Sequence, residues 1–267
     1  MSTSTYIHGT SPEEQRRLSL MNDVLLNPLS LRELALRGDE RIIDFGSGLG
    51  QFTCAMARAV ARGGVVGIER SDEQRAKAVR EANVEYRAGD VLNLDLGSEW
   101  ESFDIAHARF VLEHVPDPLR VVRAMVRAVK PGGRIVLEDD DHSVMRLWPE
   151  PPGFPELWNA YIRTYDRIGN DPYVGRRLVQ LLHQAGARPV RNTWIWFGGC
   201  AGMEYFDVLA ANMAGVVRTA RDAMIEMNLV ERDTFDAVME HYECWAKRPD
   251  AALWFSEAWA EGMPHAT

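Results

Sequence analysis

The chain has 267 residues, of which 46% are hydrophobic and 26% are charged, a composition typical of a globular protein. Its net charge of −9 argues against a broad phosphate-binding surface, so nucleic acid is not expected as a partner. The cysteines Cys54, Cys200 and Cys244 form no CxxC pair, so neither a disulfide framework nor a zinc or other metal site is predicted. The N-terminus is polar, and no apolar run reaches membrane-spanning length. The protein is therefore expected to be cytoplasmic and not to bind membranes.

The first 40 residues are predicted to form an arm followed by two helices. Residues 1–10 form the arm, and a capping signal at residues 11–14 begins the first helix. Ser30 and Glu33 form a second capping box, for a short helix that ends at Gly38. A helical segment ahead of the first strand is typical of a lid or a dimerisation element. Its exchange between protomers would give a homo-oligomer.

From Arg41 onward the sequence alternates between strand and helix patterns. Strands are expected at 41–45, 65–69, 84–88, 103–108 and 134–138, with helices at about 50–62, after Ser71, and from Pro118 to Pro131. This alternation predicts parallel βαβ units and a sheet that is covered on both faces. Ligands bind such sheets at the C-terminal ends of the strands.

The stretch from Ile42 to Gly50 reads Ile-Ile-Asp-Phe-Gly-Ser-Gly-Leu-Gly. It is predicted to be a strand, a tight turn and a helix N-terminus in direct succession. The glycines permit positive φ angles and a close approach of a ligand to the backbone. The helix N-terminus adds unpaired N–H groups, which suit a carboxylate or part of a nucleotide.

Two further carboxylates follow the next two predicted strands. Glu69 ends the second strand, where a carboxylate can accept hydrogen bonds from a ribose diol. Asp90 follows the third strand, where it can accept a hydrogen bond from an exocyclic amine. Either residue alone could be a helix cap, but the three features in this order indicate a nucleoside-containing cofactor.

In this order the motifs resemble class I S-adenosylmethionine-dependent methyltransferases of the small-molecule type. The resemblance covers residues 41–140, through residues 44–50, 67–69, 89–91, 110–115 and 130–133. It implies a seven-stranded Rossmann-like α/β sheet whose last strand is antiparallel, an N-terminal helical lid and a largely helical acceptor cap. The implied domain organisation is an arm and lid at 1–40, a cofactor-binding core at 41–142, and a cap with the remaining core elements at 143–267, within one compact domain.

The resemblance also assigns S-adenosyl-L-methionine as the cofactor and gives its residues. The glycine loop passes under the methionine part, Glu69 holds the ribose hydroxyls, Asp90 holds the adenine amine, and the backbone near Arg109 meets the amino group. Tyr6 belongs either to a lid that closes over the cofactor or to a disordered tail. The full set of cofactor residues is Tyr6, Asp44, Gly46, Ser47, Gly48, Gly50, Gln51, Glu69, Arg70, Gly89, Asp90, Val91, Arg109 and Phe110.

The C-terminal part is predicted less completely. Residues 191–197 alternate as a strand, whereas 252–259 is either a strand or a helix. The resemblance makes these segments the last two strands, with two or three helices inserted at 203–247. Seven of the eight tryptophans follow residue 100, which suits a pocket for a flat or apolar small molecule or, alternatively, a cap packed onto the sheet.

Methyl transfer is an in-line displacement, in which alignment and exclusion of water can supply much of the rate. A base is needed only if the acceptor must lose a proton. The candidates near the expected site are His114, Glu138, Asp139, Asp141 and His142. We expect Asp141 or His142 to face the acceptor, while His114 has either a catalytic or a structural role.

The leading interpretation is transfer of a methyl group to the O, N or C atom of a small aromatic or heterocyclic metabolite. A nicotinamide-dependent oxidoreductase is one alternative, although the glycine spacing and Asp90 fit it less well. A non-catalytic, cofactor-binding regulatory protein is another alternative. Methylation of RNA or protein would be expected to require a basic groove or an added recognition module.

Overall fold

The computed structural model describes residues 26–265, so Tyr6 and the helix predicted after residue 11 lie outside the described residues. The described chain divides into two compact units, each built from separate segments. The sheet unit contains residues 26–141, 173–195 and 257–265. The helical unit contains residues 142–172 and 196–256.

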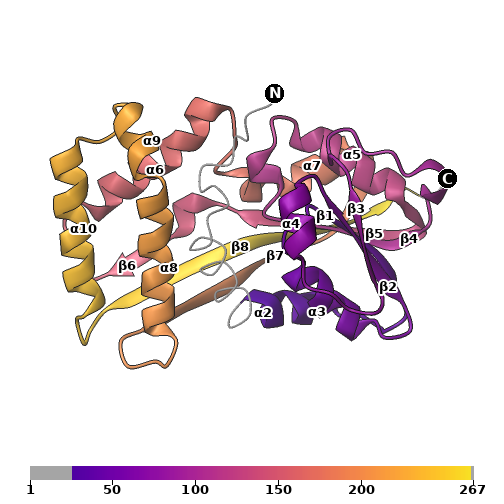
Figure 1. Ribbon diagram of the computed structural model, residues 1–267, viewed down its shortest axis with the longest axis horizontal. Helices are drawn as coiled ribbons and strands as arrows, with labels where there is room; N and C mark the ends of the chain where they lie inside the picture. The colour runs from indigo at the N-terminus through magenta and orange to yellow at the C-terminus, as the bar shows by residue number, and fades with distance from the viewer. Residues whose placement is uncertain (1–25, 266–267) are drawn as a thin grey trace. The chain divides into compact units, whose positions relative to one another are not determined.

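Parallel strands form the centre of the sheet unit, in the order β3-β2-β1-β4-β5. Their bounds are β1 Arg41–Phe45, β2 Gly64–Glu69, β3 Val84–Ala88, β4 Phe103–Arg109 and β5 Val129–Asp140. The part of β8 (Ala252–Pro264) from Glu257 to Gly262 pairs antiparallel with β5, and β7 (Ala187–Cys200) pairs with β8. The predicted α/β sheet with an antiparallel last strand is confirmed (Figure 1). The described residues form eight strands instead of the predicted seven, because the short strand β6 (Arg146–Trp148) also pairs with β8.

Helices cover both faces of the parallel strands and give the sheet unit two apolar layers. Their bounds are α2 Asn27–Leu34, α3 Gln51–Ala59, α4 Asp72–Lys77, α5 Pro118–Ala128 and α7 Leu178–Gln184. Ile42 and Ile105 share one face by register and pack in a layer with residues of α2 and α3. Ile43 and Ala106 lie on the other face, in a layer with residues of α5 and α7 (Figure 1). Burial on both faces therefore explains why apolar residues stand next to one another in β1 and β4.

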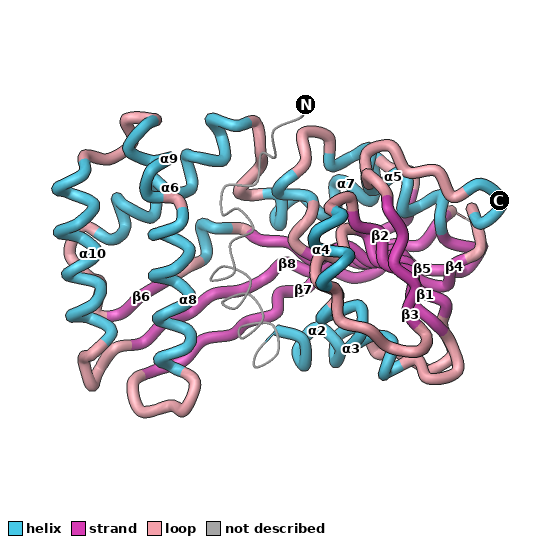
Figure 2. Tube along the Cα trace, viewed as in Figure 1, coloured by secondary structure: helices cyan, strands magenta, loops and turns pink. Residues whose placement is uncertain are grey.

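The helical unit combines a short strand pairing with four helices (Figure 2). The helices are α6 Phe154–Ile168, α8 Phe206–Thr219, α9 Arg221–Glu226 and α10 Arg232–Ala246. This unit also contains the 3₁₀ turn His142–Val144, whereas the 3₁₀ turns Gly97–Glu99, Leu112–His114 and Val174–Arg177 belong to the sheet unit. β6 (Arg146–Trp148) pairs antiparallel with the first residues of β8. Phe154 of α6 stacks on Tyr242 of α10 with 4.9 Å between ring centroids, so large aromatic rings hold this unit together.

The predicted capping box at Ser30 is wrong. α2 begins at Asn27, with Pro28 in its first turn, which places Ser30 inside the helix. The Ser30 hydroxyl donates a hydrogen bond to Glu138 Oε1 at 2.5 Å instead of capping a backbone N–H group. The helix ends at Leu34, followed by Ala35 with a φ of 46°, and does not extend to Gly38. The Ser30 hydroxyl thus forms a tertiary hydrogen bond with β5 and not the helix cap that the local sequence pattern predicted.

Several other boundaries also differ from the predictions. β5 begins at Val129 rather than at 134, because a bulge opposite residues 103–105 accommodates the Pro-Gly-Gly stretch within the strand. Helix α3 ends at Ala59 and not at about residue 62 as predicted. Strand β6 was not predicted. The segment after residue 252 is a strand, since it supplies the antiparallel partner of the buried β5. Within residues 26–265 we find no helix with the length and apolar character needed to cross a membrane.

Candidate active site

The glycine loop connects β1 to α3 and needs glycine at its turning points. Gly46, Gly48 and Gly50 have φ angles of 77°, 55° and 75°. The N–H groups of Gly46 and Ser47 donate to the Ile68 carbonyl at 2.9 and 3.0 Å, which ties the loop to β2. Glycine here therefore serves both the backbone conformation and the fit of the loop against β2.

Glu69 lies beneath this loop at the C-terminal end of β2. The residue is 9% exposed, and its carboxylate accepts hydrogen bonds from the N–H groups of Gly48 at 3.1 Å and Ser71 at 2.8 Å. These bonds orient the carboxylate, while the remaining lone pairs of its oxygens can still accept hydrogen bonds. The geometry is compatible with the predicted contact to two ribose hydroxyls.

Asp90 lies in the exposed turn after β3. Its two carboxylate oxygens accept hydrogen bonds from Leu92 N and Asn93 Nδ2, both at 3.0 Å. Gly89 donates to the Glu69 carbonyl at 3.3 Å, so the turn is joined to the end of β2. Of the neighbouring predicted residues, Arg70 is exposed and Val91 packs partly buried against the core.

Asp44, at the end of β1, is held by groups on two other elements. Its Oδ2 accepts a hydrogen bond from the Thr53 hydroxyl of α3 at 2.6 Å, and its Oδ1 lies 2.9 Å from His107 Nδ1 of β4. All three side chains are buried. Since β1 and β4 are paired with Asp44 opposite His107, this contact follows directly from the strand register.

The end of β4 carries Arg109 and Phe110. The Arg109 guanidinium donates to Asn27 Oδ1 at 2.8 Å and stacks over the Phe52 ring at 4.0 Å. Phe110 has a φ of 55°, uncommon for a residue with a side chain, and its N–H group donates to the Glu138 carbonyl at 3.1 Å. The chain therefore turns sharply where the resemblance places the amino group of the cofactor.

These residues fit S-adenosyl-L-methionine, judged by the groups that the sheet unit presents. A Cβ at Gly46 would lie 2.6 Å from Val111 Cγ2, so the loop is a cradle without space for a side chain. Within residues 26–265 the buried Ser47 hydroxyl has no hydrogen-bond partner, which leaves a polar group available in the loop. Gln51 begins α3, whose N-terminus lacks a side-chain cap. Carboxylates, a glycine cradle and an uncapped helix N-terminus suit a ligand with an adenosine and an amino acid part.

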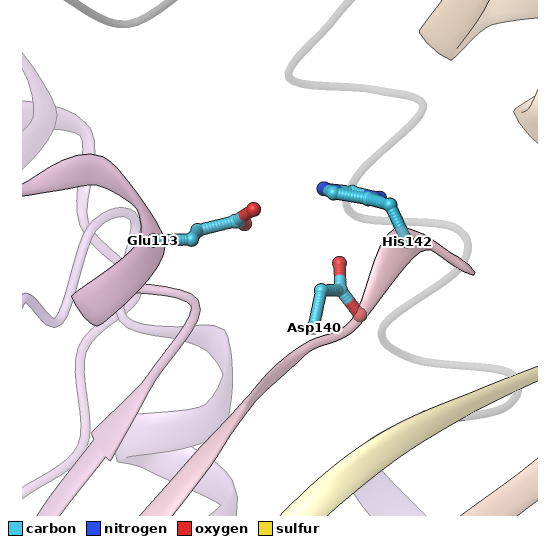
Figure 3. A group of neighbouring side chains, drawn as sticks. All are labelled: Glu113, Asp140 and His142. Carbon is cyan, nitrogen blue, oxygen red and sulfur yellow. The ribbon is translucent and has the colours of Figure 1, made fainter. Parts of the chain in front are cut away.

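Carboxyl groups gather at the end of β5. Asp139 is fully buried, and its Oδ2 accepts hydrogen bonds from the N–H groups of Leu112 at 2.8 Å and Val111 at 3.2 Å. Glu113 and Asp140 also belong to this group, and Figure 3 shows them on the 3₁₀ turn after β4 and at the end of β5. Burial and the charge of Glu113 raise the pKa of Asp139 to about 8. Burial and the same neighbour also raise the pKa of Asp140.

The raised pKa of Asp139 predicts a pH dependence of folding. Below about pH 8 the native state holds a proton that the unfolded chain releases near pH 4, so this stabilisation is complete below about pH 4 and lost as the pH rises through about 8. Asp139→Asn should therefore reduce the fall in unfolding free energy between pH 5 and 8 by roughly 1.4 kcal/mol per pH unit. Urea unfolding at several pH values measures this slope.

Asp95→Asn is the control for this measurement. Asp95 is exposed, and its pKa is lowered, first by a hydrogen bond from the Gly97 backbone, so its titration affects only more acidic solutions. An Asp139→Asn variant with the same slope as the wild type would show that Asp139 is already ionised in the native protein.

The three predicted catalytic residues lie in different surroundings. His114 Nε2 is 3.2 Å from Glu113 Oε1; burial alone would lower the pKa of His114, but the Glu113 charge gives a net increase. Asp141 accepts hydrogen bonds from Arg176 Nε and a terminal guanidinium nitrogen, at 2.6 and 2.7 Å. His142 belongs to the helical unit and is buried there.

Sequence reasoning missed several residues of the site. His107 had a usable signal, because it lies two positions before Arg109 on a strand and therefore shares its face. Thr53 lies in the first turn of α3, where its hydroxyl can reach back to the loop. Arg176 had no comparable signal, since its contact with Asp141 depends on the tertiary fold.

A model of the methyltransferase domain family matches residues 14–192, which is more than half of the chain. The chain is 36% identical over 129 residues to a ubiquinone biosynthesis O-methyltransferase from Xanthomonas oryzae pv. oryzae, covering 46% of this chain and 52% of that protein. The chain spans about half the length of the relatives that it matches.

Two solved structures share the fold. A Bacillus halodurans protein named as a candidate methyltransferase is 18% identical with a TM-score of 0.61, over 90% of this chain and 99% of that chain. The other is a phosphoethanolamine N-methyltransferase 2 from Haemonchus contortus, in complex with phosphomonomethylethanolamine and S-adenosylhomocysteine. It is 16% identical with a TM-score of 0.59, over 99% of this chain and 61% of that chain.

The family match decides between the alternatives that the sequence left open. It favours a methyl-transferring enzyme over a nicotinamide-dependent oxidoreductase and over a non-catalytic binding protein. The cradle and the carboxylates of the sheet unit agree with that choice. The chain belongs to the methyltransferase domain family, and it has the α/β fold of class I S-adenosyl-L-methionine-dependent methyltransferases.

Proposed function

We propose that the enzyme methylates a small aromatic or heterocyclic metabolite. The observation that carries this proposal is the ring cluster around His142 in the helical unit. The imidazole lies 5.8 Å from Trp158, 5.5 Å from Tyr161, 5.1 Å from Tyr165 and 6.3 Å from Phe255, measured between ring centroids. Aromatic rings combined with a few polar atoms suit a flat acceptor that carries one polar group.

Polar atoms within the cluster support the same acceptor class. The hydroxyls of Tyr161 and Tyr165 lie 2.9 Å apart, and the Trp158 indole N–H donates to the His142 carbonyl at 2.7 Å. These bonds fix the rings around the imidazole. The relative named as a ubiquinone biosynthesis O-methyltransferase supports an oxygen atom as the methylated group.

The roles proposed for the protein groups are mainly those of positioning. When bound, S-adenosyl-L-methionine supplies an electrophilic methyl group on a positively charged sulfur. His142 is proposed to receive a proton from the acceptor where one must leave, and Asp141, which Arg176 holds, is the alternative residue to face the acceptor. His114 remains paired with Glu113 and helps to fix the turn after β4.

The proposal is tested with methyl-labelled S-adenosyl-L-methionine and a panel of phenols, quinols, nitrogen heterocycles and aliphatic amines. Labelled product is expected from aromatic or heterocyclic compounds, and His142→Ala should lower turnover with the preferred compound roughly 100-fold if the proton is transferred to this residue. Transfer only to aliphatic amines, peptides or RNA would contradict the proposal.

His241→Ala serves as the matched control. His241 also lies in the helical unit, but its Nδ1 contacts the Pro152 carbonyl at 3.1 Å at an exposed position. We expect wild-type turnover from this variant. Equal losses in both variants would show that His142 acts only through the folding of the helical unit.

A further inference from the structure

His107 occupies a buried position between two carboxylates on neighbouring strands. Its Nδ1 lies 2.9 Å from Asp44 Oδ1 of β1, and its Nε2 lies 3.7 Å from Glu138 Oε2 of β5. The exposed fractions are 0% for His107, 4% for Asp44 and 0% for Glu138. Water is therefore largely excluded from both contacts.

The donors of these contacts can be assigned from the chemistry of the groups. The Thr53 hydroxyl donates to Asp44 Oδ2, and a carboxylate has no proton to donate, so Nδ1 of His107 must carry the hydrogen towards Asp44. A neutral ring would then turn the lone pair of Nε2 towards the Glu138 carboxylate. Protonation of Nε2 removes this repulsion and turns it into attraction.

The surrounding charges agree with a protonated ring. Burial alone would lower the pKa of His107, but Asp44 and Glu138 give a net increase. Burial would raise the pKa of Glu138, but Glu257, His107 and Arg109 together lower it to about 2. Burial and the neighbouring Glu138 charge raise the pKa of Glu257.

We propose that His107 is a positioning residue for the cofactor: as an imidazolium between Asp44 and Glu138, it fixes the Asp44 carboxylate at the start of the glycine loop. Asp44 is then held on both oxygens, by Thr53 from α3 and by His107 from β4. Glu138 is held in turn by the Ser30 hydroxyl of α2. The imidazolium thus connects the loop to β5 and α2, and it balances part of the negative charge of the two carboxylates.

The inference rests on Asp44 being one of the cofactor residues, as the resemblance implies. It is tested by cofactor binding alone, so the result does not depend on which acceptor is methylated. Titration of His107→Gln with S-adenosylhomocysteine should show an affinity between roughly 10- and 100-fold weaker than wild type, since a buried charge-assisted bond is lost.

Val136→Ala is the matched control for a loss of packing. Val136 is fully buried and lies directly opposite His107 in the register of β4 and β5. We expect it to lower stability while leaving the dissociation constant of S-adenosylhomocysteine within about twofold of wild type. If Val136→Ala weakens binding as much as His107→Gln, or if His107→Gln binds normally, the positioning role is refuted.

Nitrogen NMR of the wild-type imidazole gives a measurement that does not depend on the folding of a variant. Both ring nitrogens of His107 should carry a proton at pH 7.5. In the Glu138→Gln variant the ring should lose one of these two protons at a lower pH than in the wild type. A neutral ring in the wild type at that pH would overturn the proposal even if His107→Gln fails to fold.

Discussion

Gly50→Ala is expected to lower the free energy of unfolding by about 3 kcal/mol and to abolish measurable cofactor binding. A Cβ on this residue would lie 1.8 Å from the Tyr86 hydroxyl oxygen and 2.6 Å from Tyr86 Cζ, and the φ of 75° is unfavourable for alanine. Overpacking costs about 1–3 kcal/mol and an unfavourable backbone conformation about 1–3 kcal/mol. The loop must therefore shift, and with it the N-terminus of α3. Urea unfolding and titration with S-adenosylhomocysteine measure the two effects.

Gly132→Ala separates the clash from the backbone strain. Gly132 has a φ of 80°, and a Cβ there would meet no atom within 4 Å. The control should lose only about 1 kcal/mol and should bind the cofactor normally. Equal losses in the two variants would mean that Tyr86 moves aside without cost and that the loop tolerates a side chain.

Glu69→Gln is expected to weaken the affinity for S-adenosylhomocysteine roughly 100-fold. The amide nearly preserves the size of the side chain but replaces one acceptor oxygen with a donor, while Glu69 now accepts bonds from Gly48 and Ser71 through separate oxygens. The substitution therefore disturbs the loop and removes an acceptor from the predicted ribose contact. Isothermal titration measures the change in affinity.

Glu73→Gln is the control on the adjacent helix α4. Glu73 is exposed and pairs with Lys77 at 2.7 Å, an interaction worth less than about 1 kcal/mol. The affinity of the Glu73→Gln variant for S-adenosylhomocysteine should equal that of the wild type. Normal binding by Glu69→Gln would place the ribose elsewhere and remove Glu69 from the cofactor residues.

The parallel part of the fold could be predicted from the sequence because its signals are local. Val65 and Ile68 lie in a short apolar run, and Ser71 accepts a hydrogen bond from Gln74 N at 3.2 Å, as the pattern indicated. Asp117 likewise accepts from Arg120 N at 3.0 Å at the start of α5. Strand ends and caps of this kind are set within a few residues, so periodicity and side-chain chemistry suffice.

The remaining features depend on partners that are distant in sequence. Ser30 satisfies the local rule for a cap, but its hydroxyl is used by Glu138, 108 residues away. Residues 252–264 show neither the two-residue period of a strand nor the 3.6-residue period of a helix clearly, since their conformation depends on pairing with β5 and β6. The roles of His107 and Arg176 likewise arise from register and packing and not from local spacing.

The position of β8 has a consequence for how the protein folds during synthesis. This strand pairs with β5, and an ion pair joins Arg134 to Glu261, 127 residues further along the chain. Until that late segment leaves the ribosome, one edge of β5 has no partner and its N–H and C=O groups can pair with other chains. Closing so long a loop also slows folding. Nascent chains halted before β8 should therefore aggregate or recruit chaperones more readily than chains released after it.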